Sequence, residues 1–239
     1  MRVATYNIHG AVGRSGVPDV ELVGRVLAET GADVIGLQEV DSGRARSGGA
    51  DQAMMLARAL GYSCAFSAAQ SSAEHGAYGN AILARWPVVS HVTLTLPGVS
   101  LWRAEPRCAV EAVVDTPSGK VSVWSVHLGV REAERARQTS ALIGRMRRAI
   151  HEEDRMPLVL LGDLNAGRRS RLLQMLGTRL AVAEANGRGG KTWPAAYPVL
   201  GLDHVLVSAP LRVRSAGSHA SAAARVASDH LPFLADIAW

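Results

Sequence analysis

The chain has 239 residues, 48% of them hydrophobic, which is enough to bury a sizeable core in one large α/β domain or in two small ones. It has no run of about 18 apolar residues, which excludes a helical membrane span, and its two cysteines, Cys64 and Cys108, are too few for a disulfide framework and favour a reducing compartment. The net charge of +5 favours polyanionic partners, although the preference for arginine over lysine also fits a GC-rich genome.

The first half of the chain alternates strand-like and helix-like segments. The N-terminus enters an apolar run directly, without a signal peptide, so the cytoplasm is the expected location. Pro18-Asp19 and Gly31 bound a helix predicted over residues 20–29. Gly61 ends a second predicted helix over residues 51–60. Strands are expected over residues 3–6, 33–37, 62–66, 77–83, 88–96 and 107–114.

The second half continues the same alternation. Residues 121–126 predict a strand that pairs with residues 110–114 through the turn signal Thr116-Pro117-Ser118-Gly119. Residues 131–151 predict a long arginine-rich helix, with Leu142 and Met146 at helical spacing. The remaining expected elements are strands over residues 157–161, 203–207, 211–215 and 233–238 and a helix over residues 170–176. No linker interrupts them, so one domain over residues 1–239 is expected, with sheets covered by helices.

Polar residues stand where several of these apolar runs end. Asp163 and Asn165 follow the run at residues 157–161, and because residues i and i+2 of an extended chain share a face, both leave it together. Such a pair can hold a water, a metal ion or a phosphate oxygen, although a polar turn explains the segment equally well. Comparable positions are Asn7 with His9, Glu39, His127, Asp203 with His204, and Asp229 with His230. Since ligand sites in α/β folds gather at strand ends, one convergent site is predicted.

Short sequence blocks surround these residues. They are Thr5-Tyr6-Asn7, Leu37-Gln38-Glu39, Gly79-Asn80-Ala81-Ile82-Leu83, Ser125-Val126-His127-Leu128, Gly162-Asp163-Leu164-Asn165, Leu202-Asp203-His204-Val205 and Ser228-Asp229-His230-Leu231-Pro232. In this order, over residues 3–233, they resemble the endonuclease/exonuclease/phosphatase superfamily of metal-dependent phosphoesterases. The resemblance implies an α/β fold, a four-layer α/β/β/α sandwich of two mixed sheets packed face to face with helices outside, and an active site at one edge.

The implied chemistry needs a cation, a positioned water and an acid, because a phosphodiester is an anion that repels hydroxide. Hard cations prefer carboxylate and amide oxygens, and the chain shows no Cys/His zinc pattern. The resemblance therefore implies Mg²⁺ or Mn²⁺ held by Glu39, with Asn7 beside it and Asp229 as a further ligand. It also implies that Asp163 orients or deprotonates the attacking water and that Asn165 donates to a phosphate oxygen.

Two histidines are expected to face the phosphate. The resemblance implies that His230 acts as general base or transition-state stabiliser, with Asp203 fixing its tautomer. It implies that His127 contacts the phosphate and protonates the leaving group. How Asp163 and His230 divide their work is left open.

Four further side chains are expected to contact the substrate. His9 shares a strand-end face with Asn7, and Arg168 follows directly after the Asp163 and Asn165 pair. By resemblance, Asn80 lies near the phosphate or supports His127. The fourth is Arg107, which follows Glu105-Pro106 and is expected to brace the floor of the site.

The substrate class is inferred from one block and from charge. His127 stands where abasic-site endonucleases carry a Tyr-bearing segment, so the chain resembles the deoxyribonuclease, sphingomyelinase and phosphatase branches instead. We predict a monomeric phosphodiesterase with nucleic acid as its leading substrate. The alternatives are a phosphoesterase for a lipid, sugar or inositol phosphate, and a non-catalytic binding module. Trp193 and Tyr197, which precede Asp203, would stack a base, touch lipid or merely anchor a loop.

Overall fold

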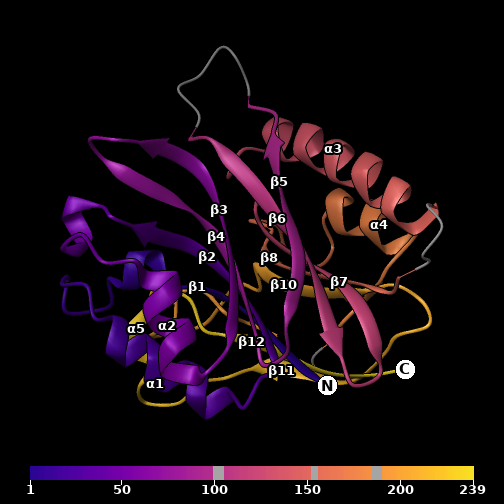
Figure 1. Cartoon of the computed structure of the whole chain (residues 1–239). Helices are drawn as coiled ribbons and strands as arrows, with labels where there is room; N and C mark the ends of the chain where they lie inside the picture. The colour runs from indigo at the N-terminus through magenta and orange to yellow at the C-terminus, as the bar shows by residue number, and fades with distance from the viewer. Residues whose placement is uncertain (99–104, 152–155, 185–189) are drawn as a thin grey trace.

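The computed structural model describes residues 1–98, 105–151, 156–184 and 190–239 and contains two six-stranded sheets packed face to face (Figure 1). The first sheet has the spatial order β11 (Arg212–Ser218), β12 (Phe233–Ala238), β1 (Arg2–Asn7), β2 (Val34–Ser42), β4 (Gly76–Ala84) and β3 (Ser63–Ser72). The second has the order β5 (Val88–Leu96), β6 (Arg107–Thr116), β7 (Gly119–His127), β8 (Leu158–Asp163), β10 (Asp203–Val207) and β9 (Ala181–Val182). Both sheets are mixed, because β1 and β2 are parallel, as are β7 and β8.

Helices cover the outer face of each sheet. The first sheet carries α1 (Val20–Thr30), α2 (Gln52–Leu60) and α5 (Ala224–Ala227), and the second carries α3 (Glu132–His151) and α4 (Arg171–Gly177). The predicted four-layer α/β/β/α sandwich is therefore confirmed, as is the pairing of β6 with β7. No helix of the described residues is long and apolar enough to cross a membrane.

Strand β8 shows how the layers are built. Leu158 and Leu160 pack into the core beneath α3 and α4, whereas Val159 and Leu161 pack into the core between the sheets. Successive residues of a strand point to opposite faces, and both faces of β8 are buried. This double burial explains why the sequence of β8 is a continuous apolar run rather than an alternation.

The two helices predicted in the first half of the chain begin and end where their capping residues indicate. The Asp19 carboxylate accepts a hydrogen bond from the Leu22 amide (2.8 Å), and Asp51 does the same for Met54 (3.1 Å). Gly31 and Gly61 follow the last turns with φ of 59° and 69°. Side-chain caps and left-handed glycines satisfy the backbone groups that helix ends leave unpaired.

The second strand of the first sheet is the main departure from prediction. The sequence predicts that this strand ends at Leu37, but β2 continues to Ser42 through a bulge between Leu37 and Val40. The polar residues Gln38 and Glu39 lie in the bulge rather than after the strand. The short elements β9 and α5 and the 3-10 turns His9–Ala11 and Ala45–Ser47 were also not predicted, because each has too few residues for a periodic signal.

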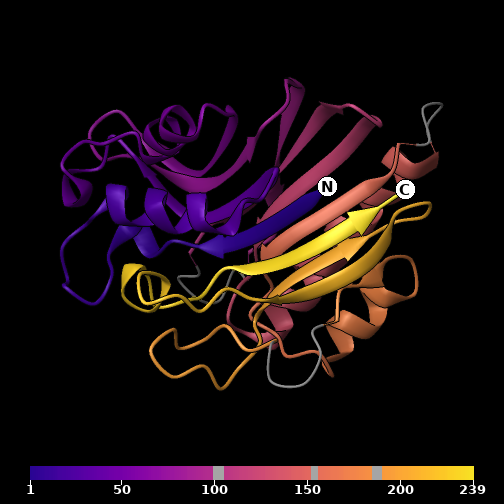
Figure 2. The same ribbon diagram turned by 90° about the horizontal axis from the view of Figure 1, so that it is seen from below.

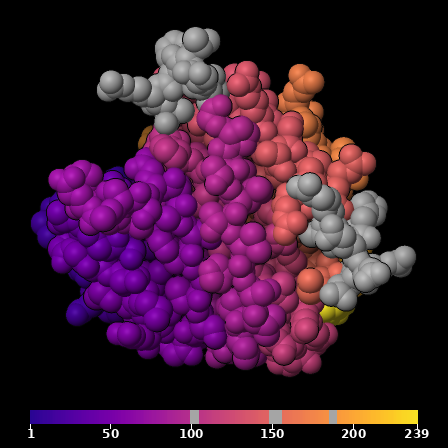
Figure 3. Space-filling view, turned by 45° about the horizontal axis from the view of Figure 1, so that its top comes forward, coloured from indigo at the N-terminus to yellow at the C-terminus, as the bar shows by residue number. Residues whose placement is uncertain are grey.

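The termini lie together at one end of the sandwich (Figure 2). The Met1 ammonium donates to the Ile237 carbonyl (3.0 Å). Strand β1 runs from there to Asn7, at the opposite end of the sheet. On another face, exposed side chains of the edge strand β5 form a band between the N-terminal third of the chain and the residues of α3 and α4 (Figure 3). The candidate site described below lies at the end of β1 away from the termini.

The sheets approach each other closely at Gly36 of β2. A Cβ atom there would lie 2.8 Å from the Cβ of Leu161 and 3.2 Å from the Cβ of Ser125. Both neighbours belong to the opposite sheet, in strands that lead to candidate site residues. Glycine at position 36 therefore permits the close contact of β2 with β7 and β8.

We predict that Gly36→Ala lowers the free energy of unfolding by about 1–3 kcal/mol, because the added methyl group overpacks the core between the sheets. The control is Gly144→Ala in α3, where an added Cβ meets no heavy atom within 4 Å and should stabilise the helix by about 0.4–1 kcal/mol. Urea unfolding measures both changes. Equal stability of Gly36→Ala and wild type would contradict the tight packing.

Candidate active site

Candidate residues from both sheets meet at one edge of the sandwich. His127 and Asp163 are register partners at the parallel ends of β7 and β8, and Asp203 pairs with Asp163 across the antiparallel β8 and β10. Asn7 ends β1 in the facing sheet. The remaining members are Glu39 in the β2 bulge, Asn165 after β8, and His230 before β12.

The buried carboxylate of Asp163 lies at the centre of this group. The Asn7 amide donates to Asp163 Oδ2 (3.1 Å) and to Glu39 Oε1 (2.9 Å), so one side chain bridges carboxylates from the two sheets. The backbone N–H of Asn165 donates to Asp163 Oδ1 (2.9 Å). Burial raises the pKa of Asp163, the charge of Asp203 adds to this, and the pKa reaches about 7 despite these hydrogen bonds. Asp163 can therefore exchange a proton near neutral pH.

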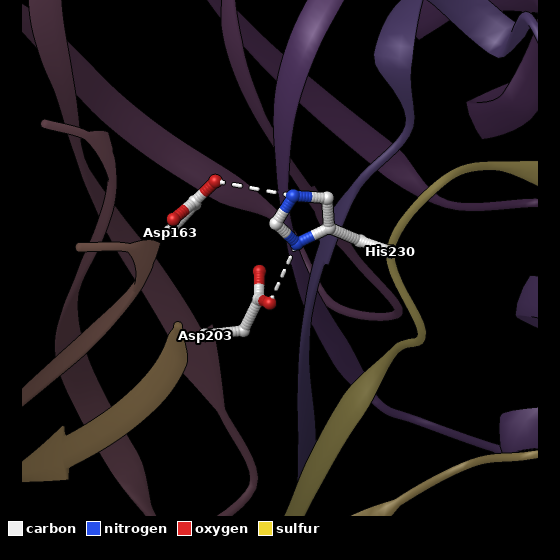
Figure 4. A group of neighbouring side chains, drawn as sticks. All are labelled: Asp163, Asp203 and His230. Carbon is white, nitrogen blue, oxygen red and sulfur yellow. Dashed lines mark hydrogen bonds and ion pairs between the residues drawn. The ribbon is translucent and has the colours of Figure 1, made fainter. Parts of the chain in front are cut away.

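His230 lies between two carboxylates (Figure 4). Its Nδ1 is 2.8 Å from Asp203 Oδ2, and its Nε2 is 3.6 Å from Asp163 Oδ2. Burial would lower the pKa of His230, but the charge and hydrogen bond of Asp203, together with the charges of Asp163 and Asp229, raise it to about 10. The ring is therefore an imidazolium at neutral pH, and it donates from Nδ1 to Asp203.

The same three side chains are close enough to form a cation site. One potential ligand atom from each of Asp163, Asp203 and His230 lies within 4.8 Å of the others. A cation at this position would have to displace the imidazolium proton that Asp203 and Asp163 stabilise. The arrangement therefore fits an imidazolium held between two carboxylates better than a metal centre.

The surroundings of His127 favour a different protonation state from that of His230. Arg107 Nη1 lies 3.0 Å from its Nδ1, and Asn165 Nδ2 lies 3.1 Å from its Nε2 while also donating to the Leu128 carbonyl (2.9 Å). Burial lowers the pKa of His127 well below its usual value, and the charges of Arg107 and His230 lower it further. An imidazolium would also direct an N–H at the Arg107 guanidinium, so His127 is neutral.

Arg107 therefore selects the tautomer of His127. A guanidinium can only donate, so Nδ1 must accept and the ring hydrogen resides on Nε2, which leaves the Asn165 side chain at Nε2 as a contact without a hydrogen bond. That hydrogen points into the site, where Nε2 is 3.5 Å from Asp163 Oδ2. Arg107 is buried and is held by Glu105 Oε2 (2.9 Å). This partnership was not predicted, since Arg107 and His127 are on different strands and no sequence pattern links them.

Unusual backbone geometry marks the same edge of the sheet. Among the described residues, the non-glycine residues with positive φ are His9 (50°), Ala11 (60°), Glu39 (56°) and Asn165 (48°). Side chains other than glycine rarely adopt this conformation, and such strain concentrates at functional sites. Three of these residues are candidate site residues, and at Glu39 the left-handed conformation coincides with the β2 bulge.

The donor set around Glu39 fits a hard divalent cation. The site has more carboxylates than cationic side chains and therefore an excess of negative charge. The carboxylates are those of Glu39, Asp163, Asp203 and Asp229, and the cations are His230 and Arg107. The Glu39 side chain keeps 21% of its surface exposed, and its neighbours present oxygen and amide groups rather than thiolates. In the present arrangement the Asn7 oxygen accepts from the His9 amide (3.0 Å).

Asp229 and His9 lie at the rim of the site. Asp229 Oδ1 is 3.8 Å from His9 Nδ1, and the indole N–H of Trp193 donates to Asp229 Oδ2 (3.3 Å). The preceding hydroxyl of Ser228 donates to the Asn7 carbonyl (2.8 Å) and accepts from the His230 amide (3.3 Å). Ser228 thus fixes the loop that carries Asp229 and His230 onto the end of β1.

Two predicted substrate contacts have other partners here. Asn80 is buried and donates to the Cys108 carbonyl (2.7 Å), so it fastens β4 to the strand that begins with Arg107. Arg168 is more than half exposed and forms an ion pair with Glu184. Neither side chain contacts the group around Asp163 among the interactions of the described residues.

A buried polar bridge joins the sheets directly beneath the site. Gln38 Nε2 donates to Ser125 Oγ (2.9 Å), and Ser125 Oγ donates back to the Leu37 carbonyl (3.0 Å). Thr5 Oγ1 donates to Gln38 Oε1 (3.2 Å). Sequence reasoning assigned no role to these residues, although Gln38 and Ser125 belong to the blocks around Glu39 and His127. Their hydrogen bonds fix the separation between the strands that carry the site.

Comparison with known proteins identifies the family of the chain. A sequence model of the Endonuclease/Exonuclease/phosphatase family matches residues 4–230, so the chain belongs to that family. It is 31% identical over 172 residues to the uncharacterized protein YbhP of Escherichia coli (strain K12), an alignment covering 68% of this chain and 63% of YbhP. The chain thus spans less than two thirds of that relative's length.

Solved structures share the fold. An endonuclease/exonuclease/phosphatase from Beutenbergia cavernae DSM 12333 aligns with a TM-score of 0.79 and 24% identity over 99% of this chain and 71% of that one. A mannosyl-6-phosphatase from Bacteroides thetaiotaomicron VPI-5482 aligns with a TM-score of 0.77 and 17% identity over 100% of both chains. At these identities the likeness concerns the fold.

We predict that Asp203→Asn lowers the pKa of His230 by about 1–3 pH units, because the charge and the charge-assisted hydrogen bond that raise it most are lost while burial still opposes the imidazolium. Since the folded-state pKa is raised, the pair stabilises the protein at neutral pH, and that contribution is lost as the pH rises through about 10. Imidazole NMR of the metal-free protein follows the titration. The control is Asp236→Asn, which removes a carboxylate that pairs with Arg2. An unchanged pKa of His230 in Asp203→Asn would refute the pairing.

Proposed function

We propose that this protein is a divalent-metal-dependent phosphodiesterase that hydrolyses its substrate with an activated water. The observation that carries the proposal is the convergence on Asp163 Oδ2 of an amide from one sheet and two imidazoles of unequal charge. Hydrolysis of a phosphodiester needs a base for the water, hydrogen-bond donors for the phosphoryl oxygens and a proton for the leaving oxygen. This group of side chains offers all three within a few ångströms.

The charge states support a division of roles. Asp163, with a pKa of about 7, is the group that orients the water and takes its proton. The imidazolium of His230 stabilises charge on the phosphoryl group and can supply a proton, with Asp203 as its positioning residue. Neutral His127 donates from Nε2 to a phosphoryl oxygen, beside the amide of Asn165. The proton-donating role expected of His127 passes to His230 in this proposal.

A divalent cation completes the site. Glu39 would hold it, with Asn7 beside it and Asp229 at the rim, and the donor chemistry suits Mg²⁺ or Mn²⁺. When bound, the cation supplies the positive charge that the site lacks and neutralises the phosphoryl oxygens. The proposal includes a monomeric enzyme in the cytoplasm, in line with the two free cysteines.

Nucleic acid or a nucleotide ester is the leading substrate, because the chain carries a net charge of +5 and buries Arg107 beside the site. A lipid or another small phosphoester is the second candidate. It is favoured by the exposed apolar side chains of Tyr197, Val199 and Leu200, which follow the rim residue Trp193.

The test is nicking of supercoiled plasmid in Mg²⁺ and in Mn²⁺. We expect metal-dependent nicking that EDTA abolishes, with a loss of about 10²–10⁴-fold in Asp163→Asn and His230→Ala, since each removes a group that moves protons or stabilises charge. Asp115→Asn, an exposed carboxylate at the far end of β6, should keep the wild-type rate.

Equal rates in the site variants and in the control would sink the assignment of Asp163 and His230. The folded wild type could instead fail to nick plasmid and still hydrolyse a small diester such as bis(p-nitrophenyl) phosphate in a metal-dependent way. That result would favour the second substrate class over nucleic acid.

A further inference from the structure

A short hairpin beside the site is more rigid than its sequence indicates. Residues 192–202 fold back on themselves, with an antiparallel bridge between Trp193 and Leu200. The Leu200 amide donates to the Trp193 carbonyl (2.8 Å), the Trp193 amide donates to the Leu200 carbonyl (3.0 Å), and the Tyr197 amide donates to the Pro194 carbonyl (3.0 Å). This segment, the 192–202 hairpin, is therefore ordered by its own hydrogen bonds.

The 192–202 hairpin is fastened to the segment that carries His230. The Ala195 amide donates to the Asp229 carbonyl (2.7 Å), and the Leu231 amide donates to the Thr192 carbonyl (2.8 Å). The indole N–H of Trp193 adds a bond to the Asp229 carboxylate (3.3 Å). The hairpin thus bonds to the residues on both sides of His230 and forms one wall at the rim of the site.

The outer part of this wall is apolar and exposed. Tyr197 is 81% exposed, Val199 50% and Leu200 48%. Two residues of chain span at most about 7 Å, so Tyr197 stays close to Ala195 and hence to the rim at Asp229. A rigid, exposed aromatic and aliphatic surface next to a reaction site is typical of a surface that contacts a ligand.

The surroundings of Glu39 and Arg107 have a different character. Arg46, with 54% of its side chain exposed, forms two hydrogen bonds with Asp41 and lies near Glu39. Glu105, 44% exposed, pairs with Arg107. A bilayer would have to desolvate these charged groups to reach the site, whereas a small ester can place its apolar group against the hairpin alone.

We infer that the 192–202 hairpin is the recognition surface for a flat aromatic ring attached to the substrate phosphate, such as a nucleobase. Tyr197 provides the exposed ring for stacking, and Trp193, whose indole N–H bonds to Asp229, adds a second aromatic side chain at the rim of the site. Stacking accepts any base, because every base has a π-face. This inference rests on the proposed phosphodiesterase function and narrows its substrate to aromatic or nucleoside esters.

The test compares two diesters with the same leaving group, thymidine 5′-(p-nitrophenyl phosphate) and methyl p-nitrophenyl phosphate. We expect wild type to prefer the thymidine ester. Tyr197→Ser should lower kcat/KM for the thymidine ester by about 5–150-fold, the range that stacking of one base supplies, and spare the methyl ester. Tyr197→Phe should keep the preference, as should Val92→Ser, which alters a half-exposed residue on β5.

Equilibrium binding of thymidine 5′-monophosphate separates this inference from the proposed function, because it requires no turnover. Weaker binding in Tyr197→Ser but not in Tyr197→Phe supports the hairpin even if neither diester is hydrolysed. A thymidine preference that survives Tyr197→Ser, together with unchanged binding, would overturn it. Binding of phosphatidylglycerol vesicles that is lost in Tyr197→Ser, without any thymidine preference, would also overturn it and assign the surface to a bilayer.

Discussion

The meeting of three side chains at one buried carboxylate oxygen, Asp163 Oδ2, is the interaction on which the candidate site depends. Asn7 reaches it from the end of β1, His127 faces it from the end of β7 in the other sheet, and His230 faces it from the loop before β12. A buried carboxylate is stable only where neighbours compensate its lost hydration. The position of Asp163 therefore constrains the spacing of both sheets and, together with Asp203, favours the charged form of His230.

The two histidines show how surroundings set function. Each is buried, yet His230 pairs with a carboxylate and is cationic, while His127 faces a guanidinium and is neutral. Groups of one residue type with opposed charge states divide acid, base and donor roles. The Gln38 to Ser125 bridge beneath them fixes the distance between the sheets, and the strained conformation of Glu39 indicates that packing holds its carboxylate in place.

Sequence reasoning captured what is periodic or local. Apolar runs located most strands, and Asp19 with Gly31 bounded α1, while the ordered blocks implied the sandwich and the members of the site. It missed the β2 bulge, because a two-residue irregularity leaves no periodic signal, and the pairing of Arg107 with His127, because that contact joins different strands. Asn80 was expected near the phosphate or in support of His127, and Arg168 at the substrate. In the structure they bond to Cys108 and Glu184, contacts that sequence spacing does not reveal.

The central claim is that a phosphodiester binds against Asp163 between the two imidazoles, with a cation at Glu39. A crystal structure with Mn²⁺ and a slowly hydrolysed phosphorothioate diester tests it most directly, because anomalous scattering locates the metal. The account predicts a manganese peak bound by Glu39 and a phosphorus atom facing Asp163, within hydrogen-bonding reach of His127 and His230. A metal bound away from Glu39, or a phosphorothioate outside this group, would contradict it.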